Sequence, residues 1–311
     1  MRVEQYDSQH KALWDDFVAR SKNGTFLMLR DYIEYNRAAL ADFSLIVRDD
    51  AGEVLALLPA NREGDRLVSR SNLTYGGFIT GENMKTARML AVFDAALAFC
   101  RAHGLRELIY RAVPHIYHRL PAEEDLYALY AHNSRLLSRT VLTVIDSRCR
   151  LPFQERRRRG AKKALKHGLM ARFSQDYAAY WTLLTDVLRQ TYGARPVHTL
   201  GEIEALHDCF PHNIKLYAAY QGAEMLGGVV IYESQQVARA QYIAASEAGK
   251  ALGALDLVFD YLLNDVYADK PFFDFGSSKE AEGPALNTGL LDQKEGFGGR
   301  AVAHDYYALA L

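Results

Sequence analysis

The spacing of apolar residues predicts helices and strands that alternate along the whole chain. Period-two alternation and short apolar runs between turn residues predict strands within 43–62, 65–80, 105–113, 214–246 and 271–276. Helical spacing, with start and stop residues at its ends, predicts a helix after Ser8 and helices over 84–104, 176–193, 199–210 and 251–270. The expected fold class is therefore α+β with mixed sheets.

The order of these elements repeats in the two halves of the chain. Three strands, a helix and a further strand occur twice, and Val92-Phe93-Asp94 matches Val258-Phe259-Asp260 at an offset of 166 residues. A repeated order of elements indicates two copies of one structural unit. We expect a first domain over 1–150 and a second domain over 151–311.

A strongly basic helix is expected to open the second copy. Pro152 suits its first turn and Gly168 its end, and Glu155 is its single acid. Its seven cations are Arg156 to Arg159, Lys162, Lys163 and Lys166. The formal net charge of the whole chain is only −1, so this charge is a local feature. It fits either a phosphate-rich ligand or a solvated helix face. Ser174 is expected to cap the helix that follows, and Thr199 with Glu202 forms a capping box.

The composition is that of an ordinary globular protein: 311 residues, 49% hydrophobic and 24% charged. The N-terminal residues lack the apolar core of a signal peptide, and no apolar run approaches the ~20 residues that span a bilayer. Three widely spaced cysteines show no metal or disulfide pattern. These features predict a cytoplasmic protein without a metal, whose membrane contact, if any, is peripheral.

Two pairs of glycines lie where strands are expected. Gly76 and Gly77 follow Tyr75, and they fit either a plain hairpin turn or a surface on which a ligand lies against the backbone. Gly227 and Gly228 interrupt an apolar strand, which favours a bulge or a splay there.

The run 273–300 carries the densest group of candidate site residues. An apolar strand ends at Asp274, and a polar segment with Ser277 and Glu280 follows it. An Asn-Thr-Gly turn at Asn287 then leads to Gln293, Lys294 and Glu295, and to the turn around Phe297. Lys294 and Glu295 also fit a surface ion pair of little energetic value.

These motifs together resemble the FemAB-like branch of the GNAT acyltransferase superfamily. The likeness rests on the two-copy plan, the basic helix and the C-terminal "FDFG…LNTGLLDQKEGFGG", while "LPANREGDRLVSRSNLTYGGFIT" resembles the polysaccharide-locus members. The resemblance implies two tandem GNAT-like domains packed side by side, with the acceptor in the cleft between them. It also implies that Gly227 and Gly228 open a cleft for the acyl donor. Lys250 and Gly253 would belong to a loop that binds the pyrophosphate of coenzyme A, although Leu255 replaces its usual small residue.

The resemblance and the residues lead to one preferred hypothesis and two alternatives. The preferred function is transfer of an acyl group, from acyl-CoA such as acetyl-CoA, to a nucleotide-linked or lipid-linked sugar of the bacterial envelope or capsule. A FemABX-type transfer from aminoacyl-tRNA to a peptidoglycan precursor is the first alternative, and a non-catalytic binding protein is the second.

Each candidate residue has an expected role in the preferred reaction. Lys294, in a motif that resembles Lys-x-x-Phe-Gly, would neutralise an oxyanion or a phosphate. Glu280 or Asp274 would be the base. Substrate binding is expected from Tyr75, Gly76, Gly77, Arg158, Lys162, Ser277, Asn287, Gln293 and Phe297.

Overall fold

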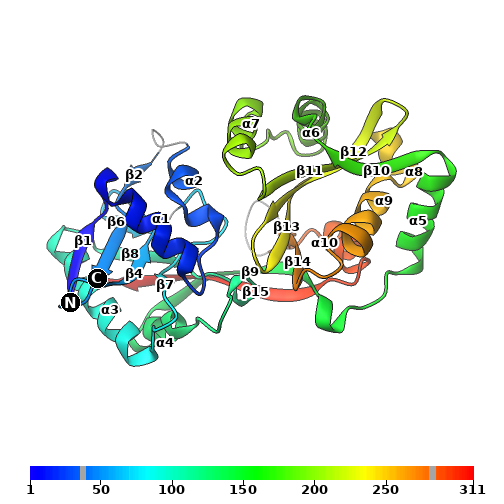
Figure 1. Cartoon of the computed structure of the whole chain (residues 1–311). Coiled ribbons are helices and arrows are strands. Elements are labelled where there is room, and N and C mark those ends of the chain that lie inside the picture. Colours follow the sequence, from blue (N-terminus) through cyan, green and yellow to red (C-terminus); the bar gives the residue numbers. More distant parts are fainter. Residues whose placement is uncertain (36–39, 70, 280–284) are drawn as a thin grey trace. The chain divides into compact units, whose positions relative to one another are not determined.

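The computed structural model describes residues 1–35, 40–69, 71–279 and 285–311, and it divides into two compact units (Figure 1). Unit 1 comprises Met1–Thr140 and Ala303–Leu311, and unit 2 comprises Val141–Val302. The boundary lies ten residues before the expected one, and the last nine residues of the chain return to unit 1. The strands β9 (Arg135–Asp146) and β15 (Arg300–Ala310) each contribute residues to both units.

Unit 1 contains an antiparallel four-stranded sheet and a second set of strands, with helices against them. The first sheet has the order β1 (Arg2–Gln5), β3 (Leu45–Arg48), β4 (Val54–Leu58) and β7 (Ile79–Thr80). The second set has the order β2 (Ala41–Asp42), β5 (Asn61–Glu63), β6 (Arg66–Val68), β8 (Glu107–Arg111) and the end of β15. The α-helices are α1 (Lys11–Arg20), α2 (Arg30–Glu34), α3 (Thr86–Ala102) and α4 (Glu124–Ala131). Short 3-10 turns lie at Ser8–His10, Phe26–Met28 and His115–Tyr117.

The core of unit 1 packs α3 against β3, β4 and β8, and it encloses one polar pair. The hydroxyl of Tyr110 donates to Asp125 Oδ2 at 2.6 Å and accepts from the backbone N–H of Phe78 at 2.7 Å. Burial raises the pKa of the Asp125 carboxyl to about 6. These bonds fix the segment after the Gly76-Gly77 pair to the core.

Unit 2 is built on a sheet with the order β10 (Leu169–Ser174), β11 (Ile214–Gln221), β12 (Glu224–Glu233), β13 (Val237–Ala245), β14 (Phe272–Ser277) and the part of β9 that belongs to unit 2. Only the β13–β14 pair in this order is parallel. Its α-helices are α5 (Glu155–Lys166), α6 (Tyr177–Tyr192), α7 (Leu200–Cys209), α8 (Glu247–Leu252), α9 (Ala254–Tyr261) and α10 (Thr288–Glu295). Ser147–Cys149 is a 3-10 turn, and Leu262–Val266 continues α9 as a π-helix.

Several predicted helix ends are confirmed, and others are wrong. Thr199 and Glu202 form the predicted capping box, and Gly168, with φ of +76°, follows α5. Asp176, rather than Ser174, caps α6 by accepting from the N–H of Ala179. At the N-terminus, Asp7 caps a 3-10 turn that precedes α1. The predicted helix 251–270 is interrupted at Gly253, because its φ of +81° ends α8 before α9 begins.

The basic helix α5 packs directly on the first turn of α9, at two glycines. A Cβ on Gly160 would lie 1.9 Å from Asp256 Oδ2, and a Cβ on Gly253 would lie 2.5 Å from the Gly160 carbonyl oxygen. Arg157 completes the contact, since its Nη1 donates to Asp256 Oδ1 at 2.6 Å. Glycine is therefore required here by the close approach of two helices.

We predict that Gly160→Ala destabilises the protein by about 1–3 kcal/mol, because the new methyl group overlaps the Asp256 side chain. In an ordinary helix the same change stabilises by about 0.5–1 kcal/mol. Gly201→Ala in α7 is the matched control, since nothing lies within 4 Å of its Cβ position. Urea unfolding should show a loss for Gly160→Ala and a small gain for Gly201→Ala. A gain for both would contradict the packing of α5 on α9.

Candidate functional site

The parallel strands β13 and β14 separate part of the way along unit 2. Their pairing runs from Val237 and Phe272 to Arg239 and Asp274, whereas β13 continues to Ala245. Both strands change register there: Gln241 is skipped in the pairing of β13 with β12, and Phe275 and Gly276 together face Thr143 of β9. The backbone of β14 beyond Asp274 therefore needs hydrogen-bond partners other than β13.

Lys294 supplies those partners from α10. Its Nζ donates to the carbonyl oxygens of Gly276 at 3.2 Å and of Ser277 at 2.8 Å, and its side chain is only 4% exposed. An ammonium group has three N–H donors, and two of them bond these carbonyl oxygens. No described residue accepts from the third, which leaves it for a ligand. Burial lowers the pKa of Lys294 to about 8, which Asp274 partly opposes and Arg239 reinforces.

Asp274 is a fully buried carboxylate, and both of its oxygens are bonded within the strand end. Oδ2 accepts from Arg239 Nη1 at 2.6 Å, and Oδ1 accepts from the N–H of Gly276 at 2.7 Å. Both carboxylate oxygens are thus occupied by donors of the protein itself. Asp274 therefore positions Gly276, whose φ of +73° glycine tolerates best, and its geometry does not favour the predicted role as a base.

Ser277, the last residue of β14, and Ser278, which follows it, differ in their bonding. Ser277 Oγ accepts from the N–H of Lys279 at 3.1 Å. Ser278 is 2% exposed, and its Oγ has no hydrogen-bond partner among the described residues. The second predicted base, Glu280, lies outside the described residues.

Asn287 is the N-cap residue of α10, and Gln293 lies on α10 directly before Lys294. The Asn287 side chain caps α10 by accepting from the N–H of Leu290, and its own N–H donates to the Ser278 carbonyl oxygen at 2.8 Å. This cap fixes α10 against the strand end. Gln293 is half-buried one residue before Lys294. Asn287 thus has a structural role.

The glycine-rich turn after Lys294 is tightly packed. Phe297 is fully buried against Phe153, Phe259 and Phe275. A Cβ on Gly298 would lie 2.6 Å from the Leu151 carbonyl oxygen, and one on Gly299 would lie 2.5 Å from Thr143 Cγ2. The turn therefore anchors α10, and Phe297 belongs to the core instead of contacting a substrate directly.

The glycine pair in β12 does not itself form the splay. Gly227 and Gly228 are paired with Ala245 and Ala244 of β13, while the irregularity in pairing with β11 skips the adjacent Leu226. A Cβ on Gly228 would lie 3.0 Å from the Tyr180 ring. The strands separate between β13 and β14 instead, so the pairing does not place the splay at these two glycines.

The segment 75–77 is packed inside unit 1. The hydroxyl of Tyr75 lies 2.9 Å from Thr25 Oγ1, and its ring contacts Tyr117. A Cβ on Gly76 would lie 2.3 Å from the Ser69 carbonyl oxygen, and one on Gly77 would lie 2.8 Å from the Tyr110 hydroxyl. At both glycines, the space that a side chain would occupy is thus filled by other atoms of the protein.

The predicted coenzyme A loop is covered by α5. The Gly160 carbonyl lies against Gly253, and the carboxylate of Asp256 stands in the first turn of α9, where a pyrophosphate would bind. A carboxylate in this place both fills space and repels an anion. Lys250 is half-exposed, pairs with Glu247 at 2.7 Å, and lines a cavity of about 530 Å³ between α6 and α8. This geometry disfavours a pyrophosphate at Gly253.

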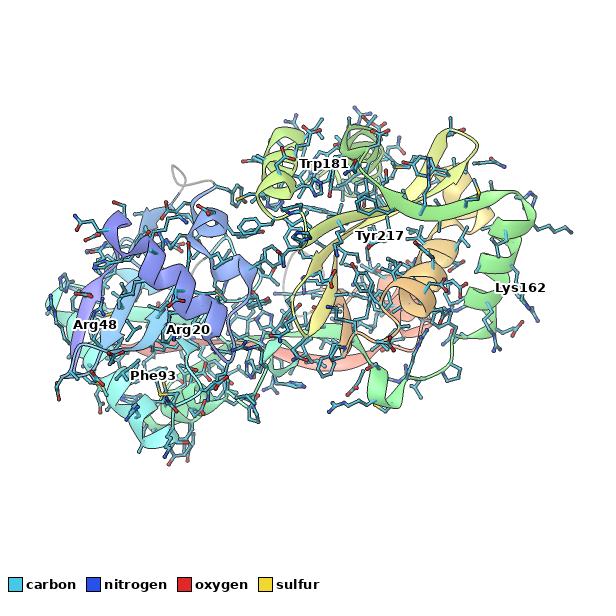
Figure 2. The ribbon with its side chains drawn as sticks, in the orientation of Figure 1. Arg20, Arg48, Phe93, Lys162, Trp181 and Tyr217 are labelled. Carbon is cyan, nitrogen blue, oxygen red and sulfur yellow. The ribbon has the colours of Figure 1, made fainter. Side chains whose placement is uncertain are left out.

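The remaining predicted residues, Arg158 and Lys162, lie on the exposed side of α5, where Figure 2 labels Lys162. Arg158 pairs with Glu155 at 2.6 Å. Among the described residues, none accepts a hydrogen bond from Lys162.

The sequence reasoning missed two residues of this site. Arg239 holds Asp274, and Ser278 places an unpaired hydroxyl in the buried strand end. An arginine within the mostly apolar strand 237–245 was the available signal for Arg239. Ser278 carried none, because its burial depends on α10.

Unit 1 also contains a cavity of about 1000 Å³, bordered by α1, the β3–β4 turn and the start of α3. Arg20 and Arg48, which Figure 2 labels, line it together with Arg88, Arg119, Asp16, Asp49, Glu53 and Glu82. Its four cations and four acids give it no preference for an anion.

Comparison with known proteins identifies the fold. No protein-family model matches the sequence, and no curated protein matches it. Among solved structures, FemX superposes with a TM-score of 0.70 at 13% identity, covering 100% of this chain and 98% of that one. L-PGS from Bacillus licheniformis gives 0.61 at 13% identity, covering 98% and 92%. A tandem GNAT protein from the clavulanic acid biosynthesis pathway gives 0.52 at 12% identity, covering 99% and 98%. The chain thus has the fold of two tandem GNAT-like domains.

We predict that the Lys294 ammonium titrates near pH 8, because burial penalises its charge. The Cε resonance of Lys294, assigned by its loss in Lys294→Met, should follow this titration in an NMR experiment. Between pH 8 and the ordinary lysine pKa of 10.5, Lys294 is mostly protonated in the unfolded chain and mostly neutral in the folded protein. The free energy of unfolding of the wild type, relative to that of Lys294→Met, should therefore rise with pH in this window. A midpoint near 10.5 would show that Lys294 is solvated.

Proposed function

We propose that the protein is an acyl-group transferase whose reacting centre lies in unit 2, where β13 and β14 separate beside Lys294. The observation that carries this proposal is the buried ammonium at an open strand end, with one donor left for a ligand. Preorganised donors in a site that excludes water stabilise developing negative charge far more than donors in water do. The tandem GNAT-like fold and the resemblance of the C-terminal run to the FemAB-like branch support the same assignment.

In the proposed reaction, an acceptor hydroxyl or amine attacks the donor carbonyl carbon. The acceptor O–C or N–C bond forms, the bond to the donor's carrier breaks, and the acceptor loses a proton to a base. The remaining N–H of Lys294 binds the carbonyl oxygen as it gains negative charge. Glu280 is the proposed base, since Asp274 is already bonded through both oxygens.

The proposed acceptor is a nucleotide-linked or lipid-linked sugar of the bacterial envelope, of the polysaccharide-locus type that residues 58–80 resemble. Ser277, Ser278 and Gln293 are the residues near Lys294 whose polar groups suit such an acceptor. The contacts of Tyr75, Gly76 and Gly77 lie inside unit 1. These residues would therefore influence acceptor binding only by maintaining the structure of unit 1.

One observation favours a second candidate donor over acyl-CoA. The first turn of α9 is occupied by Asp256 and covered by Gly160, which leaves the coenzyme A loop without its anion site. An aminoacyl ester carried on tRNA, as in the FemABX-type reaction, does not require that site. We therefore propose an aminoacyl-tRNA donor ahead of acetyl-CoA.

We predict that Lys294→Met lowers the transfer rate by about 10²–10³-fold, which is the usual loss for one oxyanion donor. The free energy of urea unfolding should also fall, by about 1–3 kcal/mol, because the Gly276 and Ser277 carbonyl oxygens lose their donor, but the variant should remain folded under assay conditions. Lys279→Met is the matched control: this exposed lysine lies at the same strand end, and its variant should retain activity. A rate loss that is fully explained by a smaller folded fraction of Lys294→Met would assign Lys294 a structural role only.

We predict that labelled aminoacyl groups pass from tRNA to an envelope sugar precursor, and that labelled acetyl-CoA neither binds nor reacts. Equilibrium dialysis with acetyl-CoA and a transfer assay with charged tRNA separate the two donors. Efficient transfer from acetyl-CoA would overturn the donor assignment and retain the transferase. Absence of transfer from either donor to a panel of sugar nucleotides would favour the non-catalytic alternative.

A further inference from the structure

The segment 158–173 combines cations with exposed apolar side chains. The outward side of α5 carries Arg158, Arg159, Lys162 and Lys166, and Arg172 follows on β10. Leu165 on α5 is 57% exposed, and Met170 and Phe173 on β10 are 61% and 45% exposed. We call these eight residues the α5–β10 surface. Exposed apolar side chains clustered among cations usually mark an interaction surface.

The packing of α5 explains why its charge faces outward. Arg157, Gly160, Ala161 and Ala164 share the side that meets α9, and Arg157 is paired there with Asp256. The opposite side of a helix with this spacing bears Arg159, Lys162 and Lys166. The charge is thus displayed on a helix held rigidly by the close contact of Gly160.

Little of this charge is neutralised by the protein itself. Residues 155–174 contain eight cationic side chains and one acid. Glu155 is shared by Arg158 and Arg159, while Asp292 pairs with Arg156. Among the described residues, none pairs with Lys162 or Lys166.

The strand β10 adds an edge to this surface. It pairs only with β11 in the sheet of unit 2, from Leu169 with Gln221 to Ser174 with Leu216. An exposed apolar edge strand invites unwanted pairing, and flanking charges are one way to prevent it. Met170 lies between Lys166 and Arg172 along the chain, and Phe173 follows Arg172. Because side chains alternate along a strand, Met170 and Phe173 project from opposite faces of the sheet at this edge.

We propose that the α5–β10 surface docks the protein on an anionic lipid bilayer with the β10 edge of the sheet facing the bilayer, so that Leu165, Met170 and Phe173 insert between headgroups held by the surrounding cations. Charge complementarity selects an anionic partner, and the exposed apolar side chains favour a bilayer over a nucleic acid. Basic segments gain affinity with each cation near an anionic membrane, and apolar side chains add burial at the headgroup boundary. Among the described residues, no helix is long and apolar enough to cross a membrane, so the contact is peripheral.

This docking is independent of the proposed function, since it does not involve Lys294 or the β13–β14 opening. If the acceptor is a lipid-linked sugar, docking would also keep the enzyme at the surface where that acceptor resides. The two proposals can fail separately.

The test is co-sedimentation of the full chain with vesicles of phosphatidylcholine containing phosphatidylglycerol, compared with vesicles of phosphatidylcholine alone. We expect binding to the anionic vesicles only, and its loss in high salt. The double variant Lys162→Gln/Lys166→Gln should lower the partition coefficient roughly 25-fold, at roughly fivefold for each cation. Leu165→Ser/Met170→Ser should weaken binding without changing the charge.

The double variant Arg2→Gln/Arg189→Gln is the matched control, because it removes two other exposed cations, 76% and 72% accessible. It should bind anionic vesicles as the wild type does, and circular dichroism should show that all variants fold. Equal binding to neutral vesicles, or an equal loss in the control pair, would overturn the proposal. The proposal would also be overturned if Lys162→Gln/Lys166→Gln lost tRNA binding but kept vesicle binding. That result would assign the surface to RNA.

Discussion

A single buried ammonium group holds the open end of β14. Where β14 leaves β13, the carbonyl oxygens of Gly276 and Ser277 need new donors, and Lys294 provides them from α10. The lysine is positioned by the Asn287 cap at one end of α10 and by the buried Phe297 at the other. Removing this one charge would leave two buried acceptors without donors and the β14 end without its support.

The contact of α5 with α9 is the second constraint, and it bears on chemistry as well as on packing. Gly160 and Gly253 allow the helices to approach until Asp256 lies beneath α5. The same approach places the Asp256 carboxylate and the Gly160 carbonyl at the N-terminus of α9, which disfavours an anion there. It also leaves the cations of α5 directed away from the core, where they form the α5–β10 surface. This one helix contact therefore supports both the proposed donor and the proposed membrane docking.

Local sequence signals predicted much of this architecture. Glycine stops, the Thr199–Glu202 box and the apolar spacing of 84–104 and 271–276 depend on residues close in sequence, and the structure follows them. The prediction of Lys294 came from a motif, whereas its burial and its carbonyl partners depend on α10 folding back onto β14. The packing around Gly227, Gly228 and Gly253 does not favour the roles expected for them, for the same reason. Glycine permits close approach, but the sequence does not say which atoms approach.

The pH dependence of acyl transfer tests the central role of Lys294 most directly. If its ammonium stabilises the transition state, kcat/KM with an envelope sugar acceptor should fall as the pH rises through about 8, where Lys294 loses its proton. In Lys294→Arg the side chain stays charged, so this fall should disappear even if the overall rate is lower. A descending limb near pH 8 that persists in Lys294→Arg would contradict the account.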